Sequence, residues 1–422
     1  MQEISINRIK EIWNHAGFQK YFRNTGWAFA SKFFALIISF FIGTLIARYL
    51  GPQRYGVLNY AVSFVGIFTF LSSFGIDSIL IRDLVKKEDE REIILDNAFI
   101  LKALGGLSII FISTISSIFF KNDTYITILI CIYSTSLFFS SPNVIDFYFQ
   151  SILKYKYSFL SQTISTILVS ILKIFLIYKS FGTGWFILAF VLETIITSFI
   201  LLIIFRKKGY TLKIKPDIKK IKEILTDSWP FVFVTAFYLI YTKIDQIMIG
   251  KILGNEPLGI YSVGVKLAEI WYFVPGIICG VLFPAIIKAK KISKKLYIER
   301  LKKLFLIIFI ITFSIAFFEF IFAKYLILIL FGKKYLESII ILKIYAWAGI
   351  IISTIMVSQQ YLTIENKTKI IATSYFIGAI SNIILNLIFI PILGIVGAAW
   401  STIISYLTIP LYSFIKIRYN KE

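Results

Sequence analysis

The sequence predicts an all-α integral membrane protein with about twelve transmembrane helices in two six-helix bundles. Of the 422 residues, 58% are hydrophobic and only 16% are charged, whereas a soluble domain carries about a quarter charged residues. The mean hydropathy of +0.82 agrees with this composition. A water-soluble fold cannot cover so much apolar surface with polar groups, so a soluble enzyme, a secreted disulfide domain and a disordered scaffold are excluded. An internal repeat, described below, divides the helices into two halves.

Twelve apolar segments are long enough to cross a bilayer, which requires ~20 residues per helix. Helices are predicted throughout because unpaired strand edges cannot face lipid. The expected segments are 24–50, 55–82, 98–120, 124–149, 158–180, 184–205, 228–253, 257–286, 304–323, 334–362, 370–390 and 394–416.

The ends and the centre of the chain complete the predicted domain plan. Residues 1–23 mix aromatic and basic side chains and are expected to form a cytoplasmic amphipathic segment rather than a cleaved signal peptide. The first bundle is expected at 24–205 and the second at 228–416. A basic cytoplasmic linker, 206–227, joins them, and 417–422 forms a cytoplasmic tail.

The basic residues predict the orientation. The net charge is +22, and the Lys and Arg residues gather in alternate loops. The loops 206–227 and 287–303 contain eight each, whereas the 51–54 loop, expected on the opposite side of the membrane, contains one. Because cytoplasmic loops are enriched in Lys and Arg, we expect a cell (inner) membrane protein with both termini in the cytoplasm. The positive charge is therefore attributed to topology and membrane lipids, and nucleic acid is not expected as a partner.

A repeat relates the two halves. Gly51 and Gly56, between the first two segments, recur as Gly254 and Gly259 at a constant offset of 203 residues. A weaker match sets Gly182 beside Gly394. Six helices is an even number, so both halves enter the membrane from the same side. The pseudo-two-fold axis should run along the membrane normal, as in transporters with parallel repeats.

Several kinds of chemistry are not expected. Cys131 and Cys279 lie in apolar segments and His15 is the single histidine, so neither a disulfide nor a metal site is predicted. No phosphate-binding loop is present, and the outer loops are too short for the catalytic site of a sugar transferase. We expect a transporter rather than an enzyme, without a cofactor, and with H+ or Na+ as a possible coupling ion.

The motifs resemble those of a known family. The first half contains Arg48-Tyr-Leu-Gly-Pro52, Tyr55-Gly56 and Phe74-Gly75, followed by Arg82. The second half contains Asp245, Gly259-Ile-Tyr261, Lys266 and Glu269. The end carries Asn382-Ile-Ile-Leu-Asn386 and Ile390-Pro391. In order and spacing these motifs resemble the polysaccharide-repeat (O-antigen-type) flippases of the multidrug/oligosaccharidyl-lipid/polysaccharide exporter superfamily.

The resemblance implies both a fold and a function. The fold would be two six-helix bundles around a central cavity, as in multidrug (MATE-like) exporters. The activity would be alternating-access transfer of a polyprenyl-pyrophosphate-linked oligosaccharide repeat unit from the inner to the outer leaflet, for cell-surface polysaccharide biosynthesis. Other polysaccharide assembly proteins are possible partners.

Charged residues deep in a membrane are costly, at ~3 kcal/mol each on insertion scales, so they indicate candidate sites. The deep set contains five lysines and three acids, namely Lys32, Lys173, Lys243, Lys266, Lys343, Glu193, Asp245 and Glu269. The excess of lysine suits a pyrophosphate cargo, because an anion crossing a low-dielectric interior needs compensating positive charge. We expect these lysines, with Arg48 and Arg82, to line a substrate cavity.

The acids have a different expected role. Asp245, Glu269, Glu193 and Asp77 are predicted to hold the lysines in place or to bind a coupling ion. An alternative is that Lys266 and Glu269, which lie three residues apart on one helical face, form only a buried structural pair. Other charges lie near the ends of segments, where reaching the surface explains them; they are Lys102, Arg82, Asp77, Asp146, Arg48 and Glu319.

Pro275 and Gly276 lie in the middle of the eighth segment and are the predicted hinge, because prolines interrupt helices and gates require bending. A static kink is the alternative.

Three other functions are alternatives. An ion-coupled exporter of small organic cations would have the same fold, but the lysine excess disfavours it. A membrane-bound sugar transferase or polymerase is disfavoured by the short outer loops, and a transport domain with a separate ATPase subunit by the repeat motifs.

Overall fold

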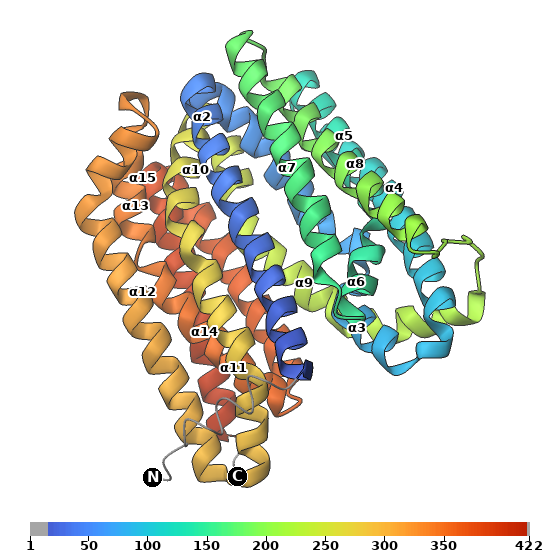
Figure 1. The fold of residues 1–422 in the computed structure, drawn as a ribbon. Helices are drawn as coiled ribbons and strands as arrows, with labels where there is room; N and C mark the ends of the chain where they lie inside the picture. The colour runs from blue at the N-terminus through green and yellow to red at the C-terminus, as the bar shows by residue number, and fades with distance from the viewer. Residues whose placement is uncertain (1–15, 420–422) are drawn as a thin grey trace. The chain divides into compact units, whose positions relative to one another are not determined.

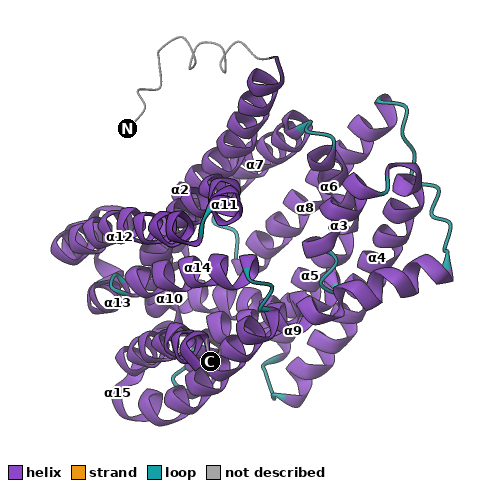
Figure 2. Cartoon of the chain, turned by 90° about the horizontal axis from the view of Figure 1, so that it is seen from below, coloured by secondary structure: helices purple, strands orange, loops and turns teal. Residues whose placement is uncertain are grey.

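The structure, a computed structural model, describes residues 16–419, with side chains for Phe33–Arg418 except that of Ser78. Every regular element in this range is a helix, and it contains no strand (Figure 2). Among the described residues, ten helical segments are long and apolar enough to cross a membrane. Two of them, Phe33–Ser73 and Thr368–Arg418, each hold two helices joined at a kink. The predicted all-α membrane fold with about twelve spans is confirmed.

Two predictions fall partly beyond this range. Most of the amphipathic segment 1–23, with His15, lies outside the described residues, as do the last three residues of the tail 417–422.

The helices pack into two compact units, each described here by itself. Unit 1 contains residues up to Ile42 and Leu71–Val232, whereas unit 2 contains Gly43–Phe70 and the chain from Phe233 onward. The first long helix, α2 (Ala16–Ser73), contributes to both units (Figure 1). The division into bundles at 24–205 and 228–416 stays a prediction.

In unit 1 the first part of α2 is followed by both short and long helices. They are α3 (Asp77–Lys86), η1 (Glu88–Glu90), α4 (Arg91–Phe119), α5 (Thr124–Phe139), η2 (Ser141–Asn143), α6 (Val144–Ser151), α7 (Tyr155–Tyr178), α8 (Thr183–Lys207) and the beginning of α9 (Ile218–Ile252).

Unit 2 combines the later part of α2 with the C-terminal half of the chain. Its further elements are the rest of α9, α10 (Asn255–Glu269), η3 (Ile270–Tyr272), α11 (Phe273–Ile292), α12 (Lys294–Leu330), η4 (Lys333–Tyr335), α13 (Ser338–Tyr345), α14 (Ala348–Ile364) and α15 (Thr368–Tyr419).

Glycines allow the helices of unit 1 to approach closely. A Cβ added at Gly106 of α4 would stand 2.5 Å from the Cα of Phe138 in α5, which no side chain can accept. Small residues bring helix backbones together in membranes, where packing rather than the hydrophobic effect holds helices. The close packing of α4 against α5 therefore requires glycine at position 106.

The linker is ordered and held on unit 1. Buried Asp96 and Asn97 of α4 accept hydrogen bonds from the backbone N–H groups of Lys213 (2.9 Å) and Asp217 (2.8 Å). Asp217 in turn caps α9 by accepting from the N–H of Lys219 (2.9 Å). Ile224, only 5% exposed, packs into the core of the unit. The polar residues at the start of α4 thus fix the position of the basic linker.

The repeat glycines take the backbone conformation that their positions require. Gly51 kinks α2 with φ 69°, and its repeat mate Gly254 separates α9 from α10 with φ 98°. Side chains other than glycine rarely adopt these positive φ angles. The sequence match between Gly51 and Gly254 therefore reflects the same turn in both halves.

Within unit 2 the repeat also appears as reciprocal contacts. A Cβ at Gly56 would stand 1.7 Å from the carbonyl oxygen of Asn255, and one at Gly259 would stand 2.0 Å from that of Pro52. At the offset of 203, Gly56 corresponds to Gly259 and Pro52 to Asn255. Gly56 packs against Asn255, and Gly259 packs against Pro52, which is the repeat mate of Asn255. A local two-fold axis requires such reciprocal contacts.

The structure corrects one predicted boundary. The segment expected at 55–82 ends at Ser73, and Asp77 and Arg82 belong to the separate helix α3. Between them Phe74 (φ 45°) and Gly75 (φ 71°) turn the chain. Gly75 lies so close to α9 that a Cβ would be 2.6 Å from the carbonyl oxygen of Ser228. Hydropathy did not reveal this turn because apolar residues continue through it.

Candidate functional site

Asp245 is the most buried charged residue of unit 2. It lies on α9, is 1% exposed, and accepts hydrogen bonds from the Tyr261 hydroxyl of α10 and the backbone N–H of Gln246 (2.7 Å). The neighbouring Gln246 side chain accepts from the Ser63 hydroxyl of α2 at 2.5 Å. Helices α2, α9 and α10 thus meet at a polar point inside unit 2.

Lys243 and Glu269 lie near this point and are half-buried. The Lys243 side chain passes Gly66 of α2, where a Cβ would stand 4.0 Å from its Cγ. Its charge acts on the carboxylates of both Glu269 and Asp245. Among the described residues, however, no ion pair within 4.0 Å joins Lys243 to either acid. Lys243 is therefore attracted to the acids without being neutralised by direct contact.

Lys266 does not contact the residue that its sequence spacing suggests. The alternative of a buried Lys266–Glu269 pair is not found, because no ion pair joins these two residues in the described part of the chain. The Lys266 ammonium instead lies against Gly43 of α2, where an added Cβ would stand 2.1 Å from Nζ. At the offset of 203, Lys266 corresponds to Ser63 and Gly43 corresponds to Gln246, and Ser63 and Gln246 form a hydrogen bond with each other. The second half of the repeat thus places an ammonium where the first half places a hydroxyl.

The two deep charges of unit 1 whose side chains are described, Lys173 and Glu193, form a pair. Lys173 of α7 is 5% exposed and binds Glu193 of α8 at 2.7 Å, with its Nζ 4.3 Å from the centre of the Phe190 ring. Glu193 also accepts from the Thr166 hydroxyl at 3.0 Å. A charge pair with such partners satisfies itself, so this pair has the geometry of a structural link between α7 and α8.

A second pair joins α4 to α3. Lys102 binds Asp77 at 2.6 Å, and the Lys102 side chain is only 7% exposed. The expectation that Lys102 reaches the surface is therefore wrong, because its side chain is buried and binds a carboxylate of a neighbouring helix. Sequence spacing did not indicate this pairing, since the two residues lie 25 positions apart.

The remaining candidates are scattered. Arg82 is exposed and pairs with Asp83 and Asp227 in unit 1. Arg48 is exposed in unit 2 and donates to the carbonyl oxygen of Ile329. Lys343 of α13 is half-buried, with its ammonium 5.3 Å from the centre of the Phe320 ring. The side chain of Lys32 lies outside the described residues.

Glu319 departs from its expected place. It lies inside α12, is 2% exposed, and its Oε1 has no hydrogen-bond partner among the described residues. Snorkelling to the surface does not explain it. An acid in this position shows that distance from a segment end, counted along the sequence, does not give the depth of a side chain.

The predicted hinge lies next to an observed break. The 3₁₀ turn η3 (Ile270–Tyr272) separates α10 from α11 within the eighth segment, and α11 contains Pro275 and Gly276 in its first turn. Proline is well accommodated at the start of a helix, where its missing N–H has no partner to lose. Bending at Pro275 and Gly276 stays a prediction.

A polar pocket in unit 1 escaped the sequence analysis. It has a volume of about 430 Å³ and draws its polar lining from α2, from the ends of η2 and α6, and from α7 and α8. These polar residues are Ser39, Asn143, Asp146, Ser158, Ser161, Gln162 and Thr197. The Asn143 Oδ1 atom and the Ser158 hydroxyl have no hydrogen-bond partner among the described residues. The sequence contains hydroxyl and amide residues at helical spacing in α7. They were not predicted as site residues because only charged residues were chosen as candidates.

No cluster of three or more His, Cys, Asp or Glu residues able to hold a metal ion occurs among the described residues. The fold and these sites together define a multi-pass α-helical membrane protein with buried charges, organised around an internal repeat. This is the architecture of a membrane transporter.

Comparisons with known proteins place the chain in a family. Residues 21–290 match the family model of polysaccharide biosynthesis proteins, and because the match spans more than half of the chain, the protein belongs to that family. A curated relative is the capsular polysaccharide biosynthesis protein CapF of Staphylococcus aureus, 26% identical over 397 residues, which cover 91% of this chain and 96% of CapF. An uncharacterized membrane protein of Methanocaldococcus jannaschii, MJ1068, is 24% identical over 420 residues, 92% of this chain and 82% of that protein.

Solved structures confirm the predicted superfamily fold. A MATE-family multidrug resistance transporter of the MOP superfamily, in an inward-facing conformation, has a TM-score of 0.74 at 14% identity, covering 92% of this chain and 95% of that one. The lipid II flippase MurJ, in an inward closed conformation, has a TM-score of 0.73 at 19% identity, covering 93% of this chain and 87% of that one.

Proposed function

We propose that this protein is a flippase that moves a polyprenyl-pyrophosphate-linked oligosaccharide repeat unit from the cytoplasmic to the outer leaflet for cell-surface polysaccharide biosynthesis. The observation that carries the proposal is the state of the lysines in unit 2. Lys243, Lys266 and Lys343 are half-buried and, among the described residues, form no ion pair. Their positive charge is available to an anionic cargo, as a pyrophosphate passing through a low-dielectric region requires.

The pairing in unit 1 sharpens this assignment. Lys173 and Glu193 neutralise each other, so they fit a structural role better than cargo binding. The same applies to Asp77, which Lys102 binds. Of the four acids expected to bind a coupling ion, Asp245 and Glu269 are the two without a lysine partner. We assign the coupling ion, H+ or Na+, to these two acids.

Family membership and fold support the cargo class and the mechanism. The chain belongs to the polysaccharide biosynthesis family, and one structure with the same fold is named as a lipid II flippase. Structures of this fold are named as inward-facing and as outward-facing, which supports alternating access. On this proposal the protein lies in the cell membrane with both termini in the cytoplasm, and it works with other polysaccharide assembly proteins.

The proposal is tested with purified protein in proteoliposomes that contain a fluorescent polyprenyl-pyrophosphate oligosaccharide in both leaflets. A membrane-impermeant reductant bleaches only the outer leaflet, so transfer appears as bleaching beyond about half of the signal. We expect this extra bleaching with the native protein and little of it with the variant Lys243→Ala/Lys266→Ala. Equal bleaching by both proteins contradicts the lysine assignment. Absence of bleaching together with uptake of small organic cations favours the exporter alternative.

A further inference from the structure

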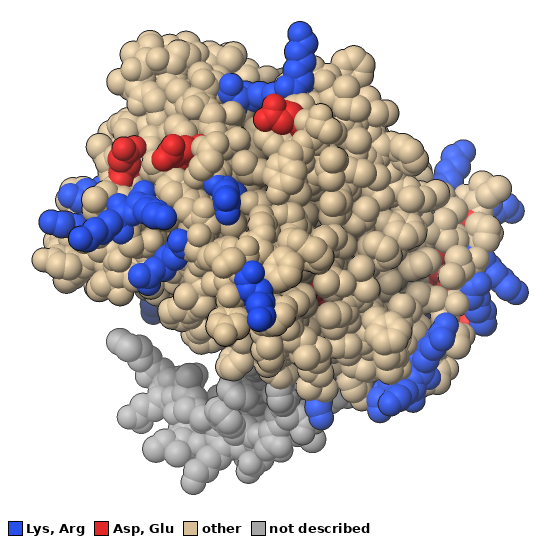
Figure 3. Space-filling model, turned by 90° about the horizontal axis from the view of Figure 1, so that it is seen from above, with Lys and Arg blue, Asp and Glu red and all other residues tan. Residues whose placement is uncertain are grey.

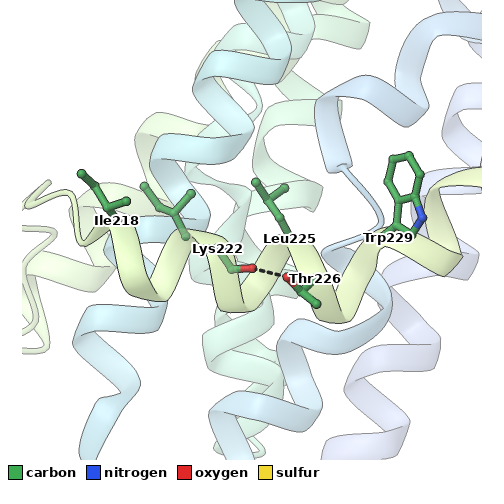
Figure 4. A pocket seen from close by; sticks show the side chains of 6 residues that line it. Ile218, Lys222, Leu225, Thr226 and Trp229 are labelled. Carbon is green, nitrogen blue, oxygen red and sulfur yellow. Dashed lines mark hydrogen bonds between the residues drawn. The ribbon is translucent and has the colours of Figure 1, made fainter.

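The beginning of α9 presents an apolar surface that the rest of unit 1 covers only in part, because Ile221 and Leu225 pack against the core while Ile218 and Trp229 are exposed. A shallow pocket there is lined by Ile218, Ile221, Lys222, Leu225, Thr226 and Trp229. Ile218 is 81% exposed and Trp229 is 60% exposed. Figure 4 shows the Ile218, Leu225 and Trp229 side chains on one side of the helix, as their spacing of seven and four residues predicts. We call these six residues the α9 surface.

The opposite face of the same helix is anchored, so the exposure is not a sign of a loose segment. Ile224 packs into the core of unit 1. Lys220 binds Glu90 (2.6 Å) and Glu223 (2.7 Å), and Glu223 also binds Lys87. The α9 surface is thus held rigidly outward by a packed and ion-paired inner face.

The lysines around this helix fall into two groups. Lys220 is paired as described, and Lys213 binds Glu92 at 2.6 Å, a hydrogen bond that raises the pKa of Lys213. In contrast, Lys215, Lys219 and Lys222 are exposed and form no ion pair within the described part of the chain. Three uncompensated ammonium groups therefore border the apolar strip.

The position of the surface along the chain identifies what it faces. Trp229 directly precedes Pro230, and from there α9 continues as an apolar membrane span. Tryptophan concentrates at the membrane–water interface, and a helix with lysines beside apolar and aromatic residues lies in the interface plane. The net positive charge complements anionic headgroups rather than another basic surface.

We infer that the α9 surface, together with Lys215, Lys219 and Lys222, binds anionic lipid headgroups of the adjacent leaflet. On the proposed topology this is the cytoplasmic leaflet. The apolar residues enter the headgroup–acyl boundary and the lysines contact lipid phosphates. This binding is separate from cargo transfer and does not depend on the proposed function.

The test places an environment-sensitive dye on the surface of the full-length protein. Thr226→Cys is labelled with bimane in a background in which Cys131 and Cys279 are replaced by Ser and Ala. The protein, in a neutral detergent at low salt, is titrated with phosphatidylglycerol or phosphatidylcholine carrying brominated acyl chains, which quench the dye on contact. We expect quenching by phosphatidylglycerol at much lower concentration than by phosphatidylcholine.

Charge variants decide whether the lysines are responsible. Each juxtamembrane lysine contributes about a fivefold preference for anionic lipid. Lys215→Gln/Lys219→Gln/Lys222→Gln should therefore raise the phosphatidylglycerol concentration for half-maximal quenching on the order of 100-fold, and the corresponding triple Arg variant should not. Salt at 0.5 M should weaken the native preference. A control, Lys121→Gln/Lys179→Gln/Lys333→Gln, removes the same charge from exposed lysines elsewhere and should leave the titration unchanged.

Four results would overturn the inference. Equal quenching by the two lipids means that the surface inserts without recognising headgroup charge. Quenching by neither lipid means that water or protein covers the surface. An equal shift in the control variant means that only net charge matters. Displacement of phosphatidylglycerol by millimolar inorganic phosphate means that the ligand is a free anion rather than a lipid.

Discussion

At the scale of single residues, the central contrast is between lysines that have an acid partner and lysines that do not. Lys173 and Lys102 are nearly inaccessible and each binds a carboxylate. Lys266 is half-buried and rests on a glycine instead. A buried pair costs little when complete and much when one partner is lost. The two groups should therefore respond to substitution in opposite ways.

For Lys266, we expect Lys266→Ala to abolish most polysaccharide export without lowering the amount of protein in the membrane. No directly paired acid is left behind, so folding should tolerate the change, whereas the positive charge for the cargo is lost. Lys266→Arg should keep a substantial part of the activity. The measurements are surface polysaccharide in a flippase-null host and membrane protein level by blot. A fall in protein level that Glu269→Ala rescues would show that the two residues form a structural pair after all.

For Lys173, the opposite pattern is expected. Lys173→Ala leaves Glu193 buried without its counter-charge, at a cost of ~3–5 kcal/mol for a well-buried pair. The membrane level and thermal stability should fall. The double variant Lys173→Leu/Glu193→Leu removes both charges and should restore them. If the double variant is stable yet inactive, the pair serves transport as well as packing.

At the scale of helices, packing depends on glycines where backbones cross. Gly56 lies against the backbone carbonyl of Asn255, and Gly259 lies against that of Pro52. A backbone carbonyl cannot move aside as a flexible side chain can. Gly43 is different, because the atom that its Cβ would meet is the end of the Lys266 side chain. The structure thus separates glycines that hold helices together from one that makes room for a charge.

We expect Gly56→Ala and Gly259→Ala each to lower stability by ~1–3 kcal/mol or more, the typical cost of overpacking. Gly280→Ala is the matched control: Gly280 lies in α11 with nothing within 4 Å of the added Cβ. That change should be neutral or stabilise the helix by up to ~1 kcal/mol. Thermal unfolding of the purified variants, followed by dye binding to newly exposed cysteine, measures the difference. Equal melting temperatures for all three variants would show that the helix crossing is looser than described.

At the scale of the whole molecule, the surface is that of a protein surrounded by lipid. Figure 3 looks from above onto the ends of the helices, where scattered groups of Lys and Arg side chains stand among uncharged residues. Large exposed apolar residues such as Phe111, Phe119 and Ile329 occur on the long helices of both units. In water such exposure would lead to association, whereas in a bilayer it is the expected contact with acyl chains.

The orientation of the molecule leads to a labelling prediction. In a background without Cys131 and Cys279, Gln53→Cys should react with an impermeant maleimide in intact cells, and Lys215→Cys should react only after the cells are opened. The reason is the concentration of basic residues in the loops on the side of Lys215. The reverse pattern of labelling would invert the proposed topology and with it the direction of transfer.

The sequence by itself determined the solvent and the kind of secondary structure. A chain with 58% hydrophobic residues must lie in lipid, and lipid offers no hydrogen bonds to the backbone, so helices follow. It also determined the repeat, because Gly51 and Gly254 are needed wherever the chain turns with a positive φ. These features depend on composition and on local backbone geometry, and both follow directly from the amino-acid sequence.

Only the tertiary structure decided which deep charges are neutralised. Lys266 and Glu269 have the spacing of a pair yet form none, while Lys102 and Asp77 form one across 25 positions. A pair requires two side chains to meet within about 4 Å, and this depends on the rotation and crossing of neighbouring helices. Those quantities are set by long-range packing, such as the space left at Gly43. The same packing buries Glu319 in α12 and leaves Ile218 and Trp229 of the α9 surface exposed.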